Sequence, residues 1–123
     1  MPSPDLICVL DDEPSVLKAL GRLLASEGLR TEKFSDSARL LEHARTHPIK
    51  VAVIDIRMPG MSGLEVLAAL HVCSPEARVI VMTGELDPTH REAALAGGAT
   101  AFFHKPFDGE NFLSAVRQAL AAP

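Results

Sequence analysis

The chain has no tryptophan, no tyrosine and only two cysteines among 123 residues. Because phenylalanine supplies all five aromatic residues, the core must be mostly aliphatic. Cys8 and Cys73 form neither a disulfide framework nor a metal motif, so we interpret both as packing residues in a reducing cytoplasm. No apolar stretch approaches the roughly 20 residues that span a bilayer, and no signal peptide is recognised, so no membrane association is expected.

An excess of positive charge is also missing. With 12 basic and 16 acidic residues the net charge is −4, which argues against this domain binding the phosphate backbone of a nucleic acid. Apolar residues make up 47% of the chain, which excludes disorder, and its length suits one domain with an ordinary core. We therefore expect a single domain over residues 1–123, with no effector domain.

Short apolar runs alternate with helical patterns along the whole chain. Five strands that alternate with five helices predict an α/β fold with a parallel sheet covered on both faces. The first, third and fourth runs are nearly pure aliphatic and belong inside the sheet, whereas the mixed second and fifth runs belong at its edges. This gives the flavodoxin-like order 2-1-3-4-5. The predicted strands are 6–10, 31–34, 51–54, 79–82 and 100–103.

The predicted helices have recognisable ends. The first begins at Pro14, the second at Ser35 or Asp36, the third at Ser62 and the fifth at Asp108. The fourth is opened by Asp87 and Pro88 and ends at Gly97-Gly98. In that fourth helix Leu95 is the one large apolar residue, so we expect it to anchor a weakly packed, mobile element.

Polar side chains follow the strand ends. Asp11, Asp12, Asp55, Thr83 and Lys105 each come directly after or at the end of a predicted strand. Because the carboxyl ends of parallel strands meet at one edge of a sheet, these groups are expected to converge in one pocket. Three crowded carboxylates repel each other, and a divalent cation relieves that repulsion. Mg²⁺ suits such a site, because it binds few carboxylates and takes further ligands from phosphate.

Phosphoryl transfer is the chemistry that these groups favour. Asp55 can attack phosphorus as a nucleophile and form an aspartyl phosphate. The reaction then needs alignment and neutralisation of charge on the phosphoryl oxygens, which the Lys105 ammonium and the Thr83 hydroxyl can supply.

Taken together, these motifs resemble the receiver domain of two-component response regulators. The resemblance covers essentially the whole chain, and its specificity lies in all the motifs occurring in order. It is carried by Asp11-Asp12, by Asp55 with Met58-Pro59-Gly60, by Ser62-Gly63, by Thr83-Gly84, and by Phe102 with Lys105-Pro106-Phe107.

The resemblance implies a function for the pocket. Asp55 would accept a phosphoryl group from a phosphohistidine on a sensor histidine kinase. Asp12 would bind Mg²⁺ directly, Asp11 directly or through water, and the backbone carbonyl of Arg57 would complete the protein ligands. The ammonium group of Lys105 and the hydroxyl of Thr83 would hold the phosphate.

The resemblance also implies a switch. Phosphorylation would draw Thr83 inward, and Phe102 would rotate into the vacated space. The face of the fourth helix, fifth strand and fifth helix would change, with phosphorylation-dependent homodimerisation as the usual coupling. The bond before Pro106 would be cis.

The resemblance also implies that two side chains flank the path of the attacking water, and in this chain these two residues carry opposite charges. Arg57 lies two residues after Asp55, and Glu85 two after Thr83. They are expected either to pair across the pocket mouth and tune the phosphate lifetime, or to be independent solvated side chains. His43 and His47, four apart on a helix, suggest a solvated face more readily than a metal site, because no third ligand is in sight.

Three classes of function remain open. The first is a switch that catalyses only its own phosphorylation and dephosphorylation, and so is not an enzyme acting on other molecules. The second is a Mg²⁺-dependent phosphatase or phosphotransferase of the haloacid-dehalogenase kind, which needs a second acid where this chain has Arg57. The third is a phosphorylation-independent receiver that serves only as a binding module. For the output of a switch, the alternative to transcription is a stand-alone receiver that acts by protein–protein contact without DNA. The opening Asp11-Asp12-Glu13-Pro14 and the segment 102–107 resemble transcription regulators, especially those of nitrogen fixation. In such proteins, DNA would be bound by an effector domain absent here.

Overall fold

A five-stranded parallel sheet runs through the centre of the molecule in the predicted order, β2-β1-β3-β4-β5. The computed structural model describes residues 6–121, so residues 1–5 and 122–123 of the predicted domain lie outside it. The strands are β1 (Leu6–Leu10), β2 (Arg30–Phe34), β3 (Val51–Asp55), β4 (Arg78–Thr83) and β5 (Ala101–His104). The prediction of interior and edge strands is confirmed.

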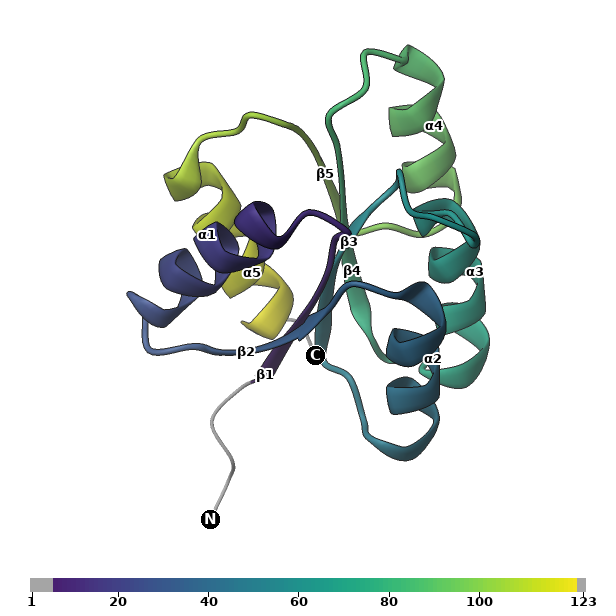
Figure 1. The fold of residues 1–123 in the computed structure, drawn as a ribbon, viewed down its shortest axis with the longest axis horizontal. Coiled ribbons are helices and arrows are strands. Elements are labelled where there is room, and N and C mark those ends of the chain that lie inside the picture. The colour runs from purple at the N-terminus through teal and green to yellow at the C-terminus, as the bar shows by residue number, and fades with distance from the viewer. Residues whose placement is uncertain (1–5, 122–123) are drawn as a thin grey trace.

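Helices cover both faces of the sheet. Figure 1 shows α1 and α5 on one side and α2, α3 and α4 on the other. The helices are α1 (Pro14–Ala25), α2 (Ser37–Thr46), α3 (Gly63–Cys73), α4 (Pro88–Ala96) and α5 (Gly109–Ala121). None of the helices in residues 6–121 is both long and apolar enough to cross a bilayer.

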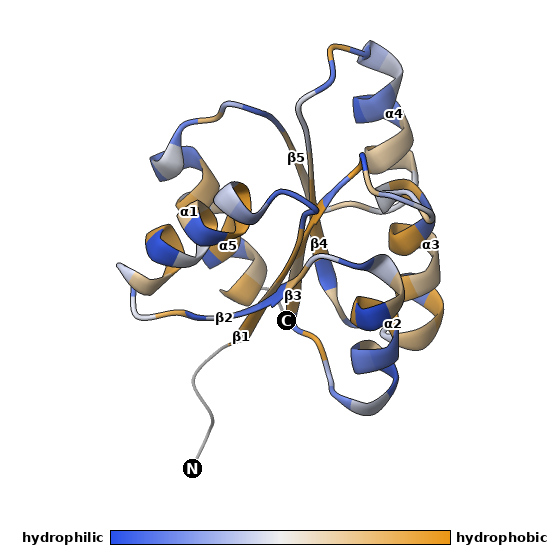
Figure 2. Cartoon of the chain, viewed as in Figure 1, coloured by the Kyte–Doolittle hydropathy of each residue, from blue (hydrophilic) through white to orange (hydrophobic). Residues whose placement is uncertain are grey.

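Two aliphatic cores lie on the two faces of the sheet. The alternating side chains of β1 separate them, with Cys8 and Leu10 on the side of α2 and α3 and with Ile7 and Val9 on the side of α1 and α5. Phe112 of α5 is fully buried in the second core. The hydropathy colouring of Figure 2 shows the apolar strands between helices with polar outer faces. This rigid centre fixes where each strand ends.

Local sequence signals set the helix starts. Asp36, not Ser35, caps α2, and its carboxylate accepts hydrogen bonds from the amides of Ala38 and Arg39. Ser62 and Glu65 form the complete capping box of α3.

Helix α4 packs differently from the prediction. Leu95 is 43% exposed, whereas Ala94 is fully buried and is the buried residue of this helix. The prediction of Leu95 as the anchor was wrong because it used side-chain size, while the rotation of the helix directs the neighbouring alanine toward the core. The small contact nevertheless leaves α4 weakly anchored.

Candidate phosphoacceptor site

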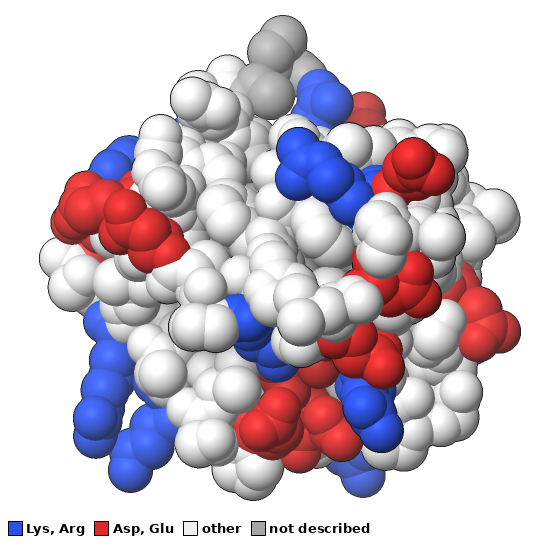
Figure 3. All heavy atoms as spheres, turned by 90° about the horizontal axis from the view of Figure 1, so that it is seen from above, with Lys and Arg blue, Asp and Glu red and all other residues white. Residues whose placement is uncertain are grey.

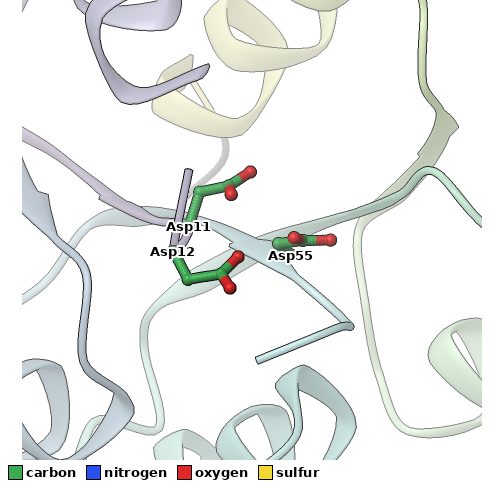
Figure 4. Close-up of side chains that lie close together, drawn as sticks. All are labelled: Asp11, Asp12 and Asp55. Atoms are coloured by element: carbon green, nitrogen blue, oxygen red, sulfur yellow. The ribbon is translucent and has the colours of Figure 1, made fainter. Parts of the chain in front are cut away.

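Three aspartates meet at the carboxyl edge of the sheet. Asp11 and Asp12 follow β1 and Asp55 ends β3, and Figure 4 shows their side chains close together. One carboxylate oxygen from each lies within 4.8 Å of the others. Asp11 and Asp55 are 0% and 3% exposed, whereas Asp12 is exposed. The adjacency of β1 and β3 in the sheet explains why residues 43 positions apart meet.

Lys105 reaches into this acidic cluster from the end of β5. Its Nζ lies 3.0 Å from Asp11 Oδ2 and 3.5 Å from Asp55 Oδ2. Its backbone N–H donates to the Thr83 carbonyl at 2.7 Å, and the Lys105–Pro106 peptide bond is cis. The lysine is therefore held at both its backbone and its ammonium group.

Glu13, which was not among the predicted site residues, is a further acidic neighbour of Lys105. Its Oε1 lies 3.8 Å from Lys105 Nζ, and its backbone N–H donates to Asp11 Oδ1 at 2.9 Å. The unbroken acidic run of residues 11–13 was the signal that could have identified it.

Burial and charge set the protonation of the site. Burial, followed by the charge of Asp11, raises the pKa of Asp55 from 3.8 to about 6, although Lys105 and the Arg57 amide act in the opposite direction. For Lys105, burial alone would lower the pKa, but the hydrogen bond that its ammonium donates to Asp11 and the charge of Asp55 reverse this and raise it. The metal-free site is thus an acidic pocket with incomplete charge compensation.

The residues present fit a divalent cation. Asp55 Oδ1 is buried and lacks a hydrogen-bond partner, a costly state for a carboxylate oxygen. A hard cation such as Mg²⁺, which prefers oxygen ligands, would satisfy that atom and reduce the repulsion with Asp11 and Asp12. These three carboxylates form the cluster of potential metal ligands found in residues 6–121.

The two expected switch residues lie on neighbouring strands. Thr83, which ends β4, is fully buried, and its Oγ1 accepts a hydrogen bond from the Glu85 amide at 3.1 Å. Phe102, in β5, packs partly buried against the core beneath α4. The guanidinium carbon of Arg91 in α4 lies 6.0 Å from the centre of the Phe102 ring.

Arg57 and Glu85 lie together at the mouth of the site. Arg57 Nη1 is 3.5 Å from Glu85 Oε2, and the two side chains are 78% and 41% exposed. The sequence left open whether Arg57 and Glu85 pair or are independent solvated side chains, and in the structure they pair. Solvent exposure makes such a pair individually weak.

The loop after Asp55 is closed tightly onto the end of β3. The Gly63 amide donates to the Ile56 carbonyl at 2.8 Å. A Cβ at Gly63 would lie 2.2 Å from the Asp55 carbonyl oxygen, so no other residue fits without displacing Asp55. Gly60 has a φ of 73°, the left-handed region that favours glycine.

A groove of about 850 Å³ extends from the site along α1. Its polar end contains Asp55 and Lys105, and its apolar wall contains Val16, Leu23 and Phe107. Figure 3, which looks onto this end of the molecule, shows acidic and basic side chains side by side.

His43 and His47 do not join this site. Their rings stack with centres 4.4 Å apart and planes 3° from parallel, and His47 Nδ1 lies 2.8 Å from the Thr46 hydroxyl. They are not part of any group of three potential metal ligands in the described chain.

Fold and site together define a doubly wound α/β domain with an acidic, lysine-containing centre at the carboxyl edge of its sheet. Sequence comparison identifies the family, because the profile of the response regulator receiver domain matches residues 7–117. The chain belongs to this family.

Individual relatives agree with that assignment. The transcriptional regulatory protein FixJ of Azorhizobium caulinodans is 38% identical over 120 residues, 98% of this chain and 57% of that protein. The chain spans about half of the length of the curated relatives it matches. Its relatives thus include transcriptional response regulators.

Solved structures share the fold. A CheY-like receiver domain from Methanospirillum hungatei has a TM-score of 0.89 and 26% identity, covering 96% of this chain and 94% of its own. A response regulator from Burkholderia pseudomallei, solved with a phosphorylated aspartic acid, calcium ion and citrate, has a TM-score of 0.83 and 25% identity, covering 97% and 75%.

Proposed function

We propose that this receiver domain is a switch that accepts a phosphoryl group on Asp55 from a sensor histidine kinase. The observation that carries the proposal is the buried, unpartnered Oδ1 of Asp55, set among two further aspartates and Lys105. A carboxylate with such an oxygen can form a new bond. Lys105 and a cation held by the aspartates can neutralise the negative charge of the incoming phosphoryl group.

The transfer follows from the chemistry of the two partners. One carboxylate oxygen of Asp55 attacks the phosphorus of a phosphohistidine, while the other remains available to the cation. The new P–O bond forms, and the P–N bond breaks. The bonding electron pair leaves with the imidazole, which departs as the neutral ring once its other nitrogen carries a proton. The product is an aspartyl phosphate, and no oxidant or further reactant is needed.

The chain's own residues position and neutralise the phosphoryl group. Lys105 moves its ammonium from the carboxylates to a phosphoryl oxygen, which its present 3.5 Å distance from Asp55 allows. Thr83 donates its hydroxyl to a second oxygen. When bound by Asp11, Asp12, Asp55 and the Arg57 carbonyl, Mg²⁺ supplies charge neutralisation at a third.

The output is a change in the face made by α4, β5 and α5. Thr83 moves toward the phosphate and Phe102 turns inward behind it. Helix α4 can follow, because Ala94 is its buried contact. A phosphorylation-dependent homodimer through this face is part of the proposal.

The groove beside the site is proposed to receive the kinase. Its apolar wall of Val16, Leu23 and Phe107 is continuous with the phosphoacceptor, so a helix carrying the phosphohistidine can bury apolar side chains there. Arg57 and Glu85 at the mouth are proposed to restrict the attacking water and so set the phosphate lifetime.

Transcription is the proposed final output, in the cytoplasm, with DNA contacted by an effector domain outside this chain. The similarity to FixJ supports this proposal. The regulator FixJ is named as a transcriptional regulatory protein, and the chain covers 57% of it.

Incubation with acetyl phosphate and Mg²⁺ tests the function. A switch gains one phosphoryl group per chain, and mass spectrometry locates it on Asp55. Continuous release of phosphate would instead indicate a phosphatase or phosphotransferase, and no reaction with any donor would indicate a pure binding module.

A further inference from the structure

Four polar or charged residues are buried in the described chain, and three of them, Asp11, Asp55 and Thr83, belong to the proposed site. The fourth, Ser37, lies outside it in the first turn of α2 and is 3% exposed. Its hydroxyl donates a hydrogen bond to the Met61 carbonyl at 2.9 Å. A buried hydroxyl that reaches a carbonyl 24 residues away serves tertiary structure rather than its own helix.

The acceptor, Met61, lies in the loop that connects Asp55 to α3, directly before Ser62, which caps that helix. Both ends of that loop are fixed, at Asp55 by the sheet and at Gly63 by its close contact with the Asp55 backbone. Between them, Met58 is buried in the core, but Gly60 and Met61 are exposed. The Ser37 bond therefore attaches the exposed part of the loop to a separate helix.

The path of this loop matters because it places the backbone of Arg57. The Arg57 carbonyl is the proposed fourth protein ligand of Mg²⁺, after the carboxylates of Asp11, Asp12 and Asp55. A carbonyl ligand contributes only when the backbone holds it at bonding distance, since it cannot adjust by rotating a side chain.

We propose that Ser37 is a positioning residue for the metal site. By fixing Met61 it limits the positions of residues 57–61, so the Arg57 carbonyl is held ready beside the aspartates. Met58 restrains one side of the loop through the core and Ser37 restrains the other from α2. This inference rests on the proposed function, because it concerns the metal of that same site.

Isothermal titration calorimetry with Mg²⁺ on the full chain tests the inference. Ser37→Ala should weaken Mg²⁺ binding about fivefold, the factor expected for one lost buried hydrogen bond. Ser37→Thr keeps the hydroxyl and should restore wild-type affinity. Ser26→Ala is the matched control, because it also removes a hydroxyl that donates to a carbonyl, at Leu23, far from the loop.

A second readout separates positioning from general stability. In amide NMR spectra without metal, Ser37→Ala should shift the Arg57 and Met61 signals, whereas Ser26→Ala should leave them in place. If Ser37→Ala does not fold, Ser37→Cys, of nearly the same size, replaces it with the same criteria.

The outcomes are distinct. Wild-type Mg²⁺ affinity in Ser37→Ala, or no restoration by Ser37→Thr, would overturn the positioning role while leaving the phosphoacceptor function intact. Failure of the wild-type protein to bind Mg²⁺ and to accept phosphate from acetyl phosphate would overturn the proposed function itself.

Discussion

Lys105 Nζ lies closer to Asp11 Oδ2, at 3.0 Å, than to Asp55 Oδ2, at 3.5 Å. The fully buried Asp11 thus holds the ammonium group beside Asp55 without saturating the carboxylate of this proposed phosphoacceptor. Because a lysine carries its charge at one compact point, it can move between these partners with a small rotation of its side chain.

Replacing the phosphoacceptor should abolish modification. Asp55→Asn keeps the size and hydrogen-bonding capacity of the side chain but removes the nucleophilic carboxylate, so acetyl phosphate should leave it unmodified. Intact-mass spectrometry of the two proteins after equal incubation measures this. Equal modification of Asp55→Asn would place the acceptor at another residue.

Removing the lysine should destabilise the metal-free protein. Lys105→Met leaves Asp11 and Asp55 facing each other without a cation, which we expect to cost about 1–3 kcal/mol of unfolding free energy. Urea unfolding in a chelator measures the loss. Added Mg²⁺ should recover part of it, and an unchanged midpoint would show that the lysine does not compensate these charges.

The pKa of Asp55 predicts how stability depends on pH. Because the folded-state pKa is raised from 3.8 to about 6, the carboxyl stabilises the metal-free fold below about pH 4, and this contribution is lost as the pH rises through about 6. Thermal unfolding in a chelator should therefore show a larger decrease from pH 5 to pH 7 in the wild type than in Asp55→Asn. Equal decreases would contradict the shift.

Magnesium should raise the melting temperature at pH 7. Binding to the folded state alone adds about 2.7 kcal/mol when the ion is at 100 times its Kd. The increase should be smaller at pH 5, where protons compete for Asp55. Asp12→Asn removes one proposed ligand and should reduce the increase at both pH values, and calorimetric scans with and without Mg²⁺ test this.

Gly63 should tolerate no side chain. Gly63→Ala places a Cβ 2.2 Å from the Asp55 carbonyl oxygen, so we expect a loss of about 1–3 kcal/mol and slower phosphorylation. Gly109→Ala is the control, because its Cβ would meet Leu23 at an ordinary 3.5 Å. Equal free energies of unfolding in urea for Gly63→Ala and Gly109→Ala would show that the backbone near Asp55 moves away from the added Cβ at no cost.

The ion pair between Arg57 and Glu85 should slow the hydrolysis of the aspartyl phosphate. Glu85→Ala releases Arg57 and opens the path for water, so dephosphorylation should be about two- to fivefold faster, the effect expected of an exposed ion pair. Loss of phosphate after removal of the donor gives the rate. Indistinguishable rates for the wild type and Glu85→Ala would dispose of this role.

Much of the site could be predicted because it depends on strand ends. An aliphatic run that terminates in Asp55 fixes that residue at the carboxyl edge, and parallel pairing brings Asp11 and Lys105 to the same edge. The sequence reports these positions directly, since burial on both faces leaves few alternatives for such strands.

Features that depend on rotation or on distant contacts were not predictable in the same way. The size of Leu95 predicts it as the anchor of α4, but the rotation of the helix buries Ala94 instead. The bond between Ser37 and Met61 joins a helix to a loop far away in sequence, and no local pattern marks it. Such contacts depend on the packing of α2 against its neighbours, which only the assembled fold defines.

Helix α4 packs on the core through one small buried side chain, the methyl group of Ala94. This weak packing also bears on how descendants of this domain can diversify. Since most of the outer surface of the helix contributes little to folding, its exposed positions are free to accumulate substitutions without unfolding the chain. New binding specificities can therefore arise there while the chemistry of the acidic site at the carboxyl edge of the sheet stays constant.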